Sequence, residues 1–226
     1  MISRRGFSTS ARWRTSSDSP TSPSISEKTT KSTAGSATTN PAPALPHLTP
    51  TGTAHMVSVS NKAHTIRTAI ATGTVRFSNP TPLTLIRSNG VKKGDVLAVS
   101  RIAGIMAAKK CPDLIPLCHP IMITHVGVDL AVIGAKNGTQ ENDFGAVVVE
   151  AKVQCQGQTG VEMEALTSVM GAALSVVDMC KAVDKGMSIG DVRVVLKEGG
   201  RSGVWKEEGW GSVVGMGGGG GGGGVW

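Results

Sequence analysis

Two long stretches of the chain repeat apolar residues at three- and four-residue steps, which keeps them on one face of a helix. The longer stretch covers residues 160–185 and contains no proline. The shorter one covers residues 93–110 and stops before Pro112. The predicted apolar faces are Met163, Leu166, Met170, Leu174, Val177 and Val183 in the first, and Val96, Val99, Ile102, Ala103, Met106 and Ala107 in the second. Alanine and glycine are frequent in residues 93–110, so we expect a closely packed neighbour there.

Three other stretches alternate apolar and polar residues, which is the period of a strand with one buried face. They cover residues 121–133, 146–156 and 188–197. A polar, glycine-rich segment joins the first two, so the pattern predicts a long-looped hairpin. Shorter strands are predicted at residues 55–60 and 74–77, and a short helix at residues 84–87. Together these elements predict an α+β domain in which helices cover one face of the hairpin.

The segment CPDLIPLCHP at residues 111–120 contains three prolines, which argue against both a helix and a central strand. We expect a rigid loop whose apolar Leu114, Ile115 and Leu117 are buried on one side. Two interpretations of His119 stand side by side. It is either a core histidine bonded to a carbonyl group or a functional residue on a fixed loop.

Residues 1–50 differ in composition from the rest of the chain. Residues 1–17 contain four Arg and no acid, the composition of a mitochondrial presequence, with a disordered basic tail as the alternative. The following Ser, Thr, Pro and Ala residues cannot bury a core. We expect a presequence and disordered linker over residues 1–50, a folded domain over residues 51–205, a disordered glycine-rich tail over residues 206–226, and a mature protein in the mitochondrial matrix.

The amino-acid composition argues against several classes of function. The net charge is +7, but the chain has only three Phe, four Trp and no Tyr, so it lacks the aromatic platforms of a single-strand nucleic-acid surface. The four cysteines, at positions 111, 118, 155 and 180, form no CxxC pair, which argues against a zinc knuckle or a disulfide framework. No uncharged apolar run reaches the roughly 18 residues of a membrane span.

Charged residues are set into the apolar stretch 160–185, at Glu162, Glu164, Asp178 and Lys181. Asp178 and Lys181 are helical neighbours. A carboxylate beside an amine suits proton transfer, but an ordinary surface ion pair gives the same spacing. Further basic clusters are Lys92 and Lys93 with Lys109 and Lys110, Lys181 with Lys185, and Lys197 with Arg201. The pattern favours a polyanionic substrate that undergoes proton transfers, such as a nucleoside triphosphate.

Neither a Walker A loop nor a GxGxxG motif is present. Five other motifs occur in order: KKGDVLAVSRIAGIMAAKK, LIPLCHP, TGVEMEALT, DMCKAVDK and KEGGRSG. In this order and spacing they closely resemble the cyclic pyranopterin monophosphate synthase family of molybdenum cofactor biosynthesis. The resemblance runs from about residue 48 to residue 203.

The resemblance implies a phosphorus–oxygen lyase. Its substrate would be (8S)-3′,8-cyclo-7,8-dihydroguanosine 5′-triphosphate, supplied by a radical SAM GTP cyclase, and its products cyclic pyranopterin monophosphate and pyrophosphate. The implied fold is α+β, a ferredoxin-like antiparallel sheet with two long helices packed on one face. The implied assembly is a homohexamer, a trimer of dimers with shared active sites. No cofactor is required, although Mg²⁺ can assist phosphate chemistry.

By matching motifs, the resemblance also implies site residues. The catalytic residues would be Lys93, Asp178 and Lys181. The substrate pocket would be lined by Leu117, Cys118, His119, Met163, Glu164 and Lys197, with Lys109 as a triphosphate contact.

Two other functions compete with this one. A non-catalytic anion-binding protein would need the positive charge but not a carboxylate paired with a lysine. A nucleic-acid binder would need aromatic residues among its cations. The joint presence of Lys93, His119, Asp178 and Lys181 favours the enzyme, which acts on a small molecule and engages neither nucleic acid nor membrane.

Overall fold

The computed structural model describes residues 47–49, 51–134 and 143–212. The chain divides into two units, residues 1–44 and residues 45–226, and every described residue belongs to the second. The predicted presequence and nearly all of the predicted linker therefore lie outside the described residues. So does the predicted glycine-rich tail from residue 213 onward.

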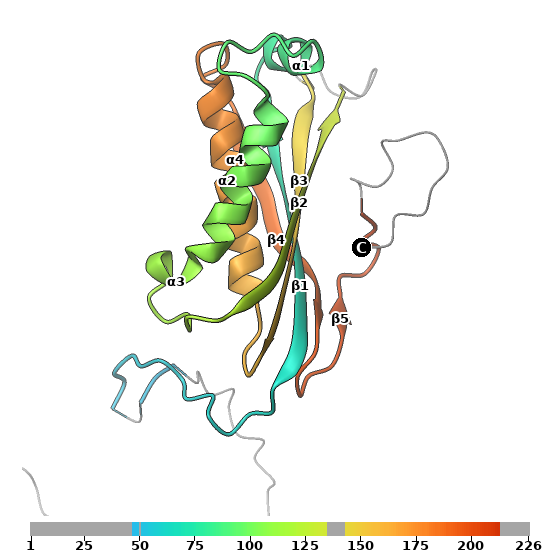
Figure 1. Cartoon of the computed structure of the whole chain (residues 1–226). Coiled ribbons are helices and arrows are strands. Elements are labelled where there is room, and N and C mark those ends of the chain that lie inside the picture. The colour runs from blue at the N-terminus through green and yellow to red at the C-terminus, as the bar shows by residue number, and fades with distance from the viewer. Residues whose placement is uncertain (1–46, 50, 135–142, 213–226) are drawn as a thin grey trace, which may run out of the picture. The chain divides into compact units, whose positions relative to one another are not determined.

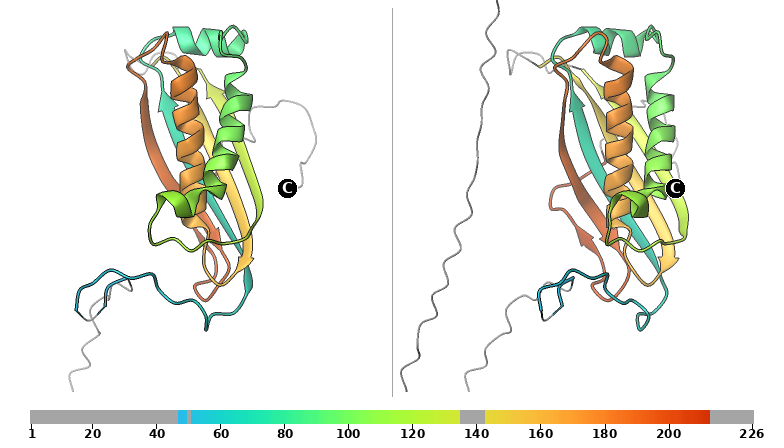
Figure 2. Two further views of the ribbon diagram at one scale, coloured as in Figure 1. Left: turned by 60° about the vertical axis from the view of Figure 1, so that its left-hand side comes forward. Right: turned by 90° about the vertical axis from the view of Figure 1, so that its left-hand side faces the viewer.

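The described residues form one five-stranded antiparallel sheet with the strand order β2-β3-β1-β4-β5. The strands are β1 (Thr65–Arg76), β2 (Ile123–Ile133), β3 (Ala146–Gly157), β4 (Ser188–Glu198) and β5 (Trp205–Lys206). The helices are α1 (Thr81–Arg87), α2 (Val96–Lys109), α3 (Cys111–Leu114) and α4 (Glu162–Cys180). The two long helices, α2 and α4, lie side by side on the same face of the sheet (Figures 1 and 2).

The predicted fold class is confirmed. The chain order β1-α2-β2-β3-α4-β4, with β1 central and β4 and β3 beside it, is the ferredoxin-like arrangement. The helix α4 is long and apolar enough, by length and composition, to cross a membrane. More than half of it is buried within this fold, which identifies it as the core helix of the sheet.

Most side chains on the buried face of α4 are small, although Glu164 and Met179 are also buried. Its buried residues include Ala165, Ser168, Val169, Ala172, Ala173 and Val176. A Cβ atom added at Gly171 would lie 2.4 Å from the Cβ of Ala107 in α2. The hydroxyl of Ser168 donates a hydrogen bond to the carbonyl oxygen of Gly104, 3.0 Å away. The two helices therefore approach each other backbone to backbone, as the frequent alanine and glycine predicted.

The predicted apolar faces of both helices are only partly buried: Leu166 and Val177 of α4 and Val96 of α2 pack in the core, but other members are exposed. On α4, Leu174 is 56% exposed, and on α2, Ile102 is 60% exposed, with Val99 and Met106 also exposed. The other buried positions of α2 are Ser100, Gly104 and Ala108, none of which belongs to the predicted face. Because α2 and α4 pack closely on the sheet and on each other, only small side chains fit at these contacts. The larger apolar residues therefore point outward.

The central strand was the main element missed. Sequence alternation predicted a strand only at residues 74–77, whereas β1 runs over Thr65–Arg76. Its Ala, Thr and Gly residues carry little hydrophobic signal, yet α4 packs directly on them. A Cβ atom at Gly73 would lie 2.6 Å from Cγ1 of Val169. The predicted strand at residues 55–60 is irregular in the structure.

The loop at residues 111–120 also differs from prediction. Its first residues form the short helix α3, because Pro112 occupies the first turn, where no backbone N–H is required. Leu114 is 63% exposed and Leu117 is also exposed, so the expected burial through these leucines is wrong.

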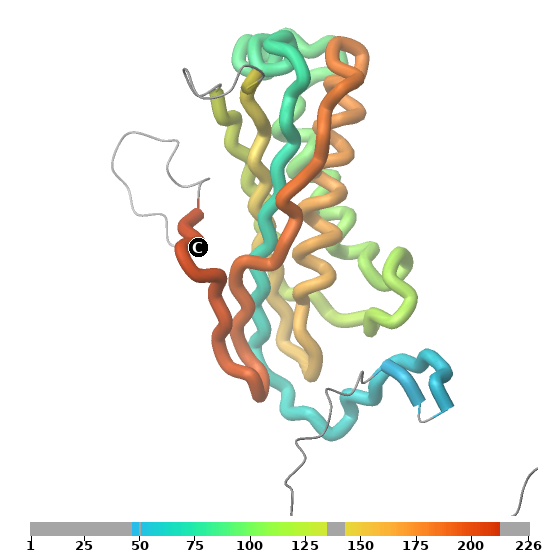
Figure 3. Tube along the Cα trace, turned by 180° about the vertical axis from the view of Figure 1, so that it is seen from behind, coloured from blue at the N-terminus to red at the C-terminus, as the bar shows by residue number. Residues whose placement is uncertain are grey.

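Beyond β4 the chain turns back along the edge of the sheet. The short strand β5 pairs with β4, as seen from behind in Figure 3. Glu207 accepts a hydrogen bond from Arg193 of β4, 2.7 Å away. The Ser212 hydroxyl donates to Glu150 of β3, 2.9 Å away.

Candidate functional site

Two amines hold one carboxylate at the C-terminal end of α4. The Nζ of Lys93 lies 2.8 Å from Oδ2 of Asp178 and also 2.8 Å from its backbone carbonyl oxygen. The Nζ of Lys181 lies 2.6 Å from Oδ1 of the same residue. Asp178 is in the last turn of α4, and Lys181 is the residue that caps it. The three residues predicted to be catalytic therefore meet in one cluster.

Lys93 reaches this cluster from the turn that precedes α2. That turn is fixed by Asp95, whose carboxylate accepts a hydrogen bond from the backbone N–H of Ala98 and caps the helix. Hydrogen bonds from Lys181 and Lys93 lower the pKa of Asp178 to about 2. At neutral pH the carboxylate is ionised and orients both amines.

A buried acid missed by sequence analysis supports the cluster. Asp184 is 2% exposed and accepts hydrogen bonds from the backbone N–H groups of Ser78, at 2.8 Å, and Gly186, at 3.0 Å. It also accepts a hydrogen bond from the Ser78 hydroxyl. The chain turns at Asp184, so α4 ends at Cys180 and not at residue 185 as predicted. Asp184 thus fixes the backbone that carries Lys181.

The other end of α4 carries a different cluster. The sulfur atoms of Cys111 and Cys118 and a carboxylate oxygen of Glu164 all lie within 4.8 Å of one another. Glu164 is 3% exposed, whereas the adjacent Met163 is exposed. Burial raises the pKa of Glu164, and the nearby Glu162 carboxylate adds to this effect. A carboxyl group whose pKa is raised in this way can exchange a proton nearer neutral pH.

His119 makes a structural hydrogen bond and also lies next to Cys118 of this cluster. Its Nε2 donates a hydrogen bond to the carbonyl oxygen of Val57, 2.8 Å away. Because a carbonyl oxygen only accepts, the proton is on Nε2 and Nδ1 remains available as an acceptor in the neutral ring. The bond also holds the irregular segment around Val57 against the loop of Leu117 and Cys118.

A cationic cavity lies where the ends of β1, β3 and β4 meet. Its volume is about 160 Å³, and its lining includes three cations, two carboxylates and a hydroxyl group: Lys62, Arg67, Lys197, Glu162, Glu198 and Ser202. The Nζ of Lys197 lies 3.6 Å from Glu162 and 3.2 Å from the hydroxyl of Ser202. Lys197 is among the predicted site residues, whereas Lys62 and Arg67 are not, because they lie in a segment with no motif.

The glycine-rich loop after β4 shapes this cavity. Gly199 has a φ of +94°, and a Cβ atom there would lie 2.2 Å from the carbonyl oxygen of Ile66. Only glycine therefore fits between β4 and β1 at this turn. The same turn places Gly200 and Arg201 in an adjoining cavity of about 540 Å³ that also includes Lys62 and Arg67.

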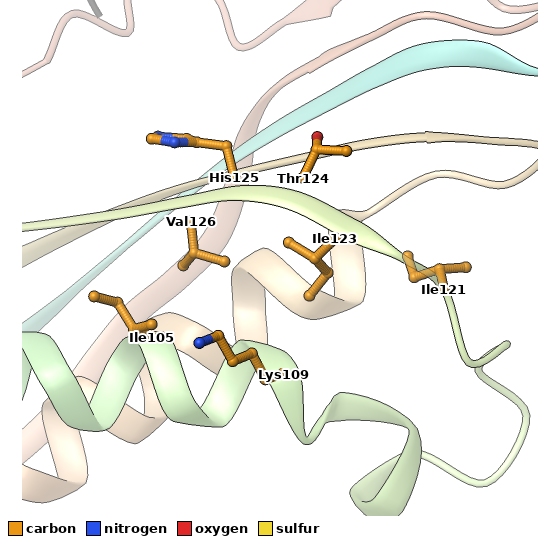
Figure 4. Close-up of a pocket in the computed structure, with 7 residues that line it drawn as sticks. All are labelled: Ile105, Lys109, Ile121, Ile123, Thr124, His125 and Val126. Atoms are coloured by element: carbon orange, nitrogen blue, oxygen red, sulfur yellow. The ribbon is translucent and has the colours of Figure 1, made fainter.

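Lys109 lies in a groove between the end of α2 and β2, with a volume of about 480 Å³ (Figure 4). Ile105 and Lys109 face Ile123 and Val126 across it, while His125 projects from the other side of the strand. Lys109 also lines a smaller cavity of about 220 Å³ together with Glu164. It therefore belongs with the cluster at the N-terminal end of α4.

The predicted site residues do not form one site within a single chain. Glu164 and Asp178 are fourteen residues apart on one straight helix, which at 1.5 Å per residue separates them by about 21 Å. Lys93, Asp178 and Lys181 gather at one end of α4, near α1 in Figure 1. Cys118, Glu164 and Lys109 gather at the other end, near α3.

The sequence is similar to a known family over the part of the chain that carries both clusters. The sequence profile of the MoaC family matches residues 56–200. A protein of Chloroflexus aggregans named cyclic pyranopterin monophosphate synthase is 54% identical over 164 residues, covering 73% of this chain and 94% of its own length. A protein of Rhodospirillum rubrum with the same name is 51% identical over 171 residues, covering 74% of this chain and 98% of its own.

Proposed function

This chain belongs to the MoaC family, and from that premise we propose that it is a lyase of molybdenum cofactor biosynthesis, a cyclic pyranopterin monophosphate synthase. It converts (8S)-3′,8-cyclo-7,8-dihydroguanosine 5′-triphosphate to cyclic pyranopterin monophosphate and releases pyrophosphate. The single observation that carries this function is the identity of about half of the aligned residues to proteins of that name, over nearly the full length of those proteins.

The cluster at the C-terminal end of α4 supplies acid–base groups in this proposal. Lys181 and Lys93 transfer protons, and Asp178 holds both amines at fixed positions 2.6 to 2.8 Å from its oxygens. Fixed geometry of this kind is what general acid–base catalysis requires. The cluster is open to solvent in one chain, since the Asp178 side chain is 56% exposed.

The cluster at the N-terminal end of α4 and the cationic cavity beside it hold the substrate. Cys118, His119, Met163 and Glu164 contact the ring system, with Leu117 at the edge of the pocket. The triphosphate lies among Lys197, Arg67, Lys62 and Arg201, with Lys109 as a further contact. Converging cations stabilise the negative charge that develops on the departing pyrophosphate.

The acid–base cluster at the C-terminal end of α4 and the substrate-binding region at its N-terminal end act together only when subunits associate. We infer a homohexamer, a trimer of dimers, in which the C-terminal end of α4 in one subunit completes the substrate pocket of its neighbour. The outward apolar residues Val99, Ile102 and Met106 of α2 support association, because a helix that is apolar on two faces is normally covered on both.

The substrate class implies a supplier, and the N-terminal composition implies a location. A radical SAM GTP cyclase provides the cyclised triphosphate. Residues 1–50 direct the protein to the mitochondrial matrix, and a reporter fused to those residues that stayed in the cytosol would contradict this assignment. No resident cofactor is part of the proposal, and Mg²⁺, where it takes part, arrives with the triphosphate.

Incubation of the purified protein with the cyclised triphosphate tests the activity. We expect release of one pyrophosphate per substrate and loss of about 10²–10⁴-fold in rate for Lys181→Ala, the usual size of a general acid–base contribution. The matched control is Lys206→Ala, which removes an exposed lysine outside the family match. Retention of intact triphosphate by a folded wild-type protein would instead identify a binding protein without this activity.

A further inference from the structure

Cys111 has no part in the proposed reaction, yet it lies at the centre of a cluster of metal-ligating atoms. Three separate places in the fold contribute to that cluster. Cys111 begins α3, Cys118 closes the loop that follows, and Glu164 is in the first turn of α4. Their two sulfur atoms and one carboxylate oxygen lie within 4.8 Å of one another.

Two thiolates and one carboxylate are ligands that Zn²⁺ prefers. In a tetrahedral site with Zn–S bonds of 2.3 Å, neighbouring sulfur atoms are about 3.8 Å apart. Donor atoms within 4.8 Å of one another therefore need to move by no more than about 1 Å to close on an ion. Three protein ligands leave a fourth position open, as in zinc sites that bind an exchangeable ligand.

The backbone around the two cysteines is already held in place. Pro112, Pro116 and Pro120 stiffen the loop, and the N–H of Cys118 donates to the carbonyl oxygen of Ile115 at 3.0 Å. The hydroxyl of Thr167 donates a hydrogen bond to the sulfur of Cys111, 3.5 Å away. Outer hydrogen bonds of this kind orient metal ligands.

The buried charge of Glu164 and the cavity that reaches it also suit the binding of a cation. Glu164 is 3% exposed, and among the residues that the structure describes no lysine or arginine forms an ion pair with it. The cavity of about 220 Å³ that reaches Glu164 is lined by Lys109 and Lys110. Lys110 pairs with Asp113, which lines the same cavity. Lys109 is therefore the cation that offsets the remaining negative charge once two thiolates and one carboxylate surround a divalent ion.

We propose that Cys111, Cys118 and Glu164 form a binding site for a thiophilic divalent cation, with Zn²⁺ as the natural occupant. An ion held there occupies Cys118 and Glu164, so it excludes the substrate and inhibits turnover. The inhibition rests on the proposed function, whereas binding of the ion does not.

Binding is measured with Co²⁺ as the probe, added to the fully reduced full-length protein. We expect one Co²⁺ per chain, a thiolate-to-cobalt charge-transfer band, and displacement of the cobalt by Zn²⁺. Cys111→Ser and Cys118→Ser should each lower the affinity by at least about 100-fold, and Thr167→Val by about 10-fold, as for inner and outer partners of metal ligands. The matched control is Cys180→Ser, since Cys180 is equally buried but lies at the far end of α4.

The outcomes separate the two proposals. A reduced wild-type protein that gives no charge-transfer band, or one in which Cys180→Ser weakens binding as much as Cys111→Ser, overturns the metal site. Inhibition is then scored for each protein against its own metal-free rate, and Cys111→Ser should need at least about 100-fold more Zn²⁺ than wild type. A protein that binds cobalt through Cys111 but releases no pyrophosphate keeps the site and refutes only the activity.

Discussion

Two of the carboxyl groups on α4, those of Asp178 and Glu164, have pKa values that their surroundings shift in opposite directions. Hydrogen bonds from Lys181 and Lys93 lower the pKa of Asp178 to about 2, while burial raises the pKa of Glu164. Environments that separate two carboxyl groups in this way assign them different roles. Asp178 stays charged and positions amines, and Glu164 is the group able to carry a proton.

Replacing Asp178 by Asn tests its positioning role. An uncharged amide attracts Lys93 and Lys181 much less strongly than a carboxylate does, so the amines lose their common ionic anchor, and Lys93 keeps its hydrogen bond to the backbone carbonyl oxygen of residue 178. We expect turnover to fall by about 10²–10⁴-fold with little change in the unfolding midpoint, because Asp178 is exposed. Asp191→Asn is the control: it removes another exposed, ion-paired aspartate, and Asn tolerates the φ of +56° at that position. Equal rates for the two variants would remove Asp178 from the reaction.

Asp184 gives a prediction about stability and pH. Burial works to raise its pKa, but hydrogen bonds from Ser78 and Gly186 outweigh burial and lower it below the ordinary aspartate value of 3.8. The folded state therefore gains stability from the charged form above about pH 4 and loses it as the pH falls through the lowered pKa. Asp184→Asn should lower the free energy of unfolding by about 1–3 kcal/mol at pH 7.

That difference should shrink in acid, since wild-type Asp184 becomes neutral while Asn does not titrate. Denaturant unfolding of both proteins between pH 7 and pH 3 provides the measurement. A gap that widens as the pH falls would show that the carboxylate does not stabilise the turn.

At the scale of elements, sequence pattern predicted the two long helices, the hairpin and β4, but neither α3 nor β5, nor which helix faces are buried. Periodicity places Leu174 and Ile102 on an apolar helix face. It cannot tell whether such a face packs on the sheet of its own chain or points away from it. The central strand β1 was missed because its buried positions are mostly small residues, such as Ala69, Ala71 and Gly73, and their burial follows from the close packing of α4 at Gly73. The pairing of Lys93 with Asp178, across 85 residues of sequence, came from family resemblance and not from pattern.

Gly171→Ala tests the close packing of α2 and α4. In an isolated helix this change is favourable, because alanine has the higher helix propensity. Here the added Cβ atom would lie 2.4 Å from the Cβ of Ala107 and 3.2 Å from the carbonyl oxygen of Ala103. We expect the free energy of unfolding to fall by about 1–3 kcal/mol, the usual cost of overpacking.

Ser175→Ala, at a half-buried position of the same helix, is the control for propensity alone. Chemical denaturation of the two variants gives the comparison. If Gly171→Ala is as stable as wild type or more so, the helices are not in the tight contact described.

At the scale of the whole molecule, the separation of about 21 Å between Glu164 and Asp178 along one helix is the decisive constraint. Acid–base groups at one end cannot act on a substrate held at the other end of the same chain. Either a second subunit completes each site, or one of the two clusters has no part in the reaction. Two inactive variants, one at each end of α4, distinguish these cases.

Lys181→Ala and Glu164→Gln are each expected to be inactive alone. In a mixed two-fold dimer, one site contains both substitutions, and the other combines the intact C-terminal end of one subunit with the intact N-terminal end of its partner. Random pairing makes half of the dimers mixed, with one of two sites intact, so co-expressed subunits should regain about a quarter of wild-type turnover. The Lys181→Ala protein alone and the Glu164→Gln protein alone give the baseline activity. Activity no higher than that baseline would show that subunits share no site, and the assembly proposed here would then be wrong.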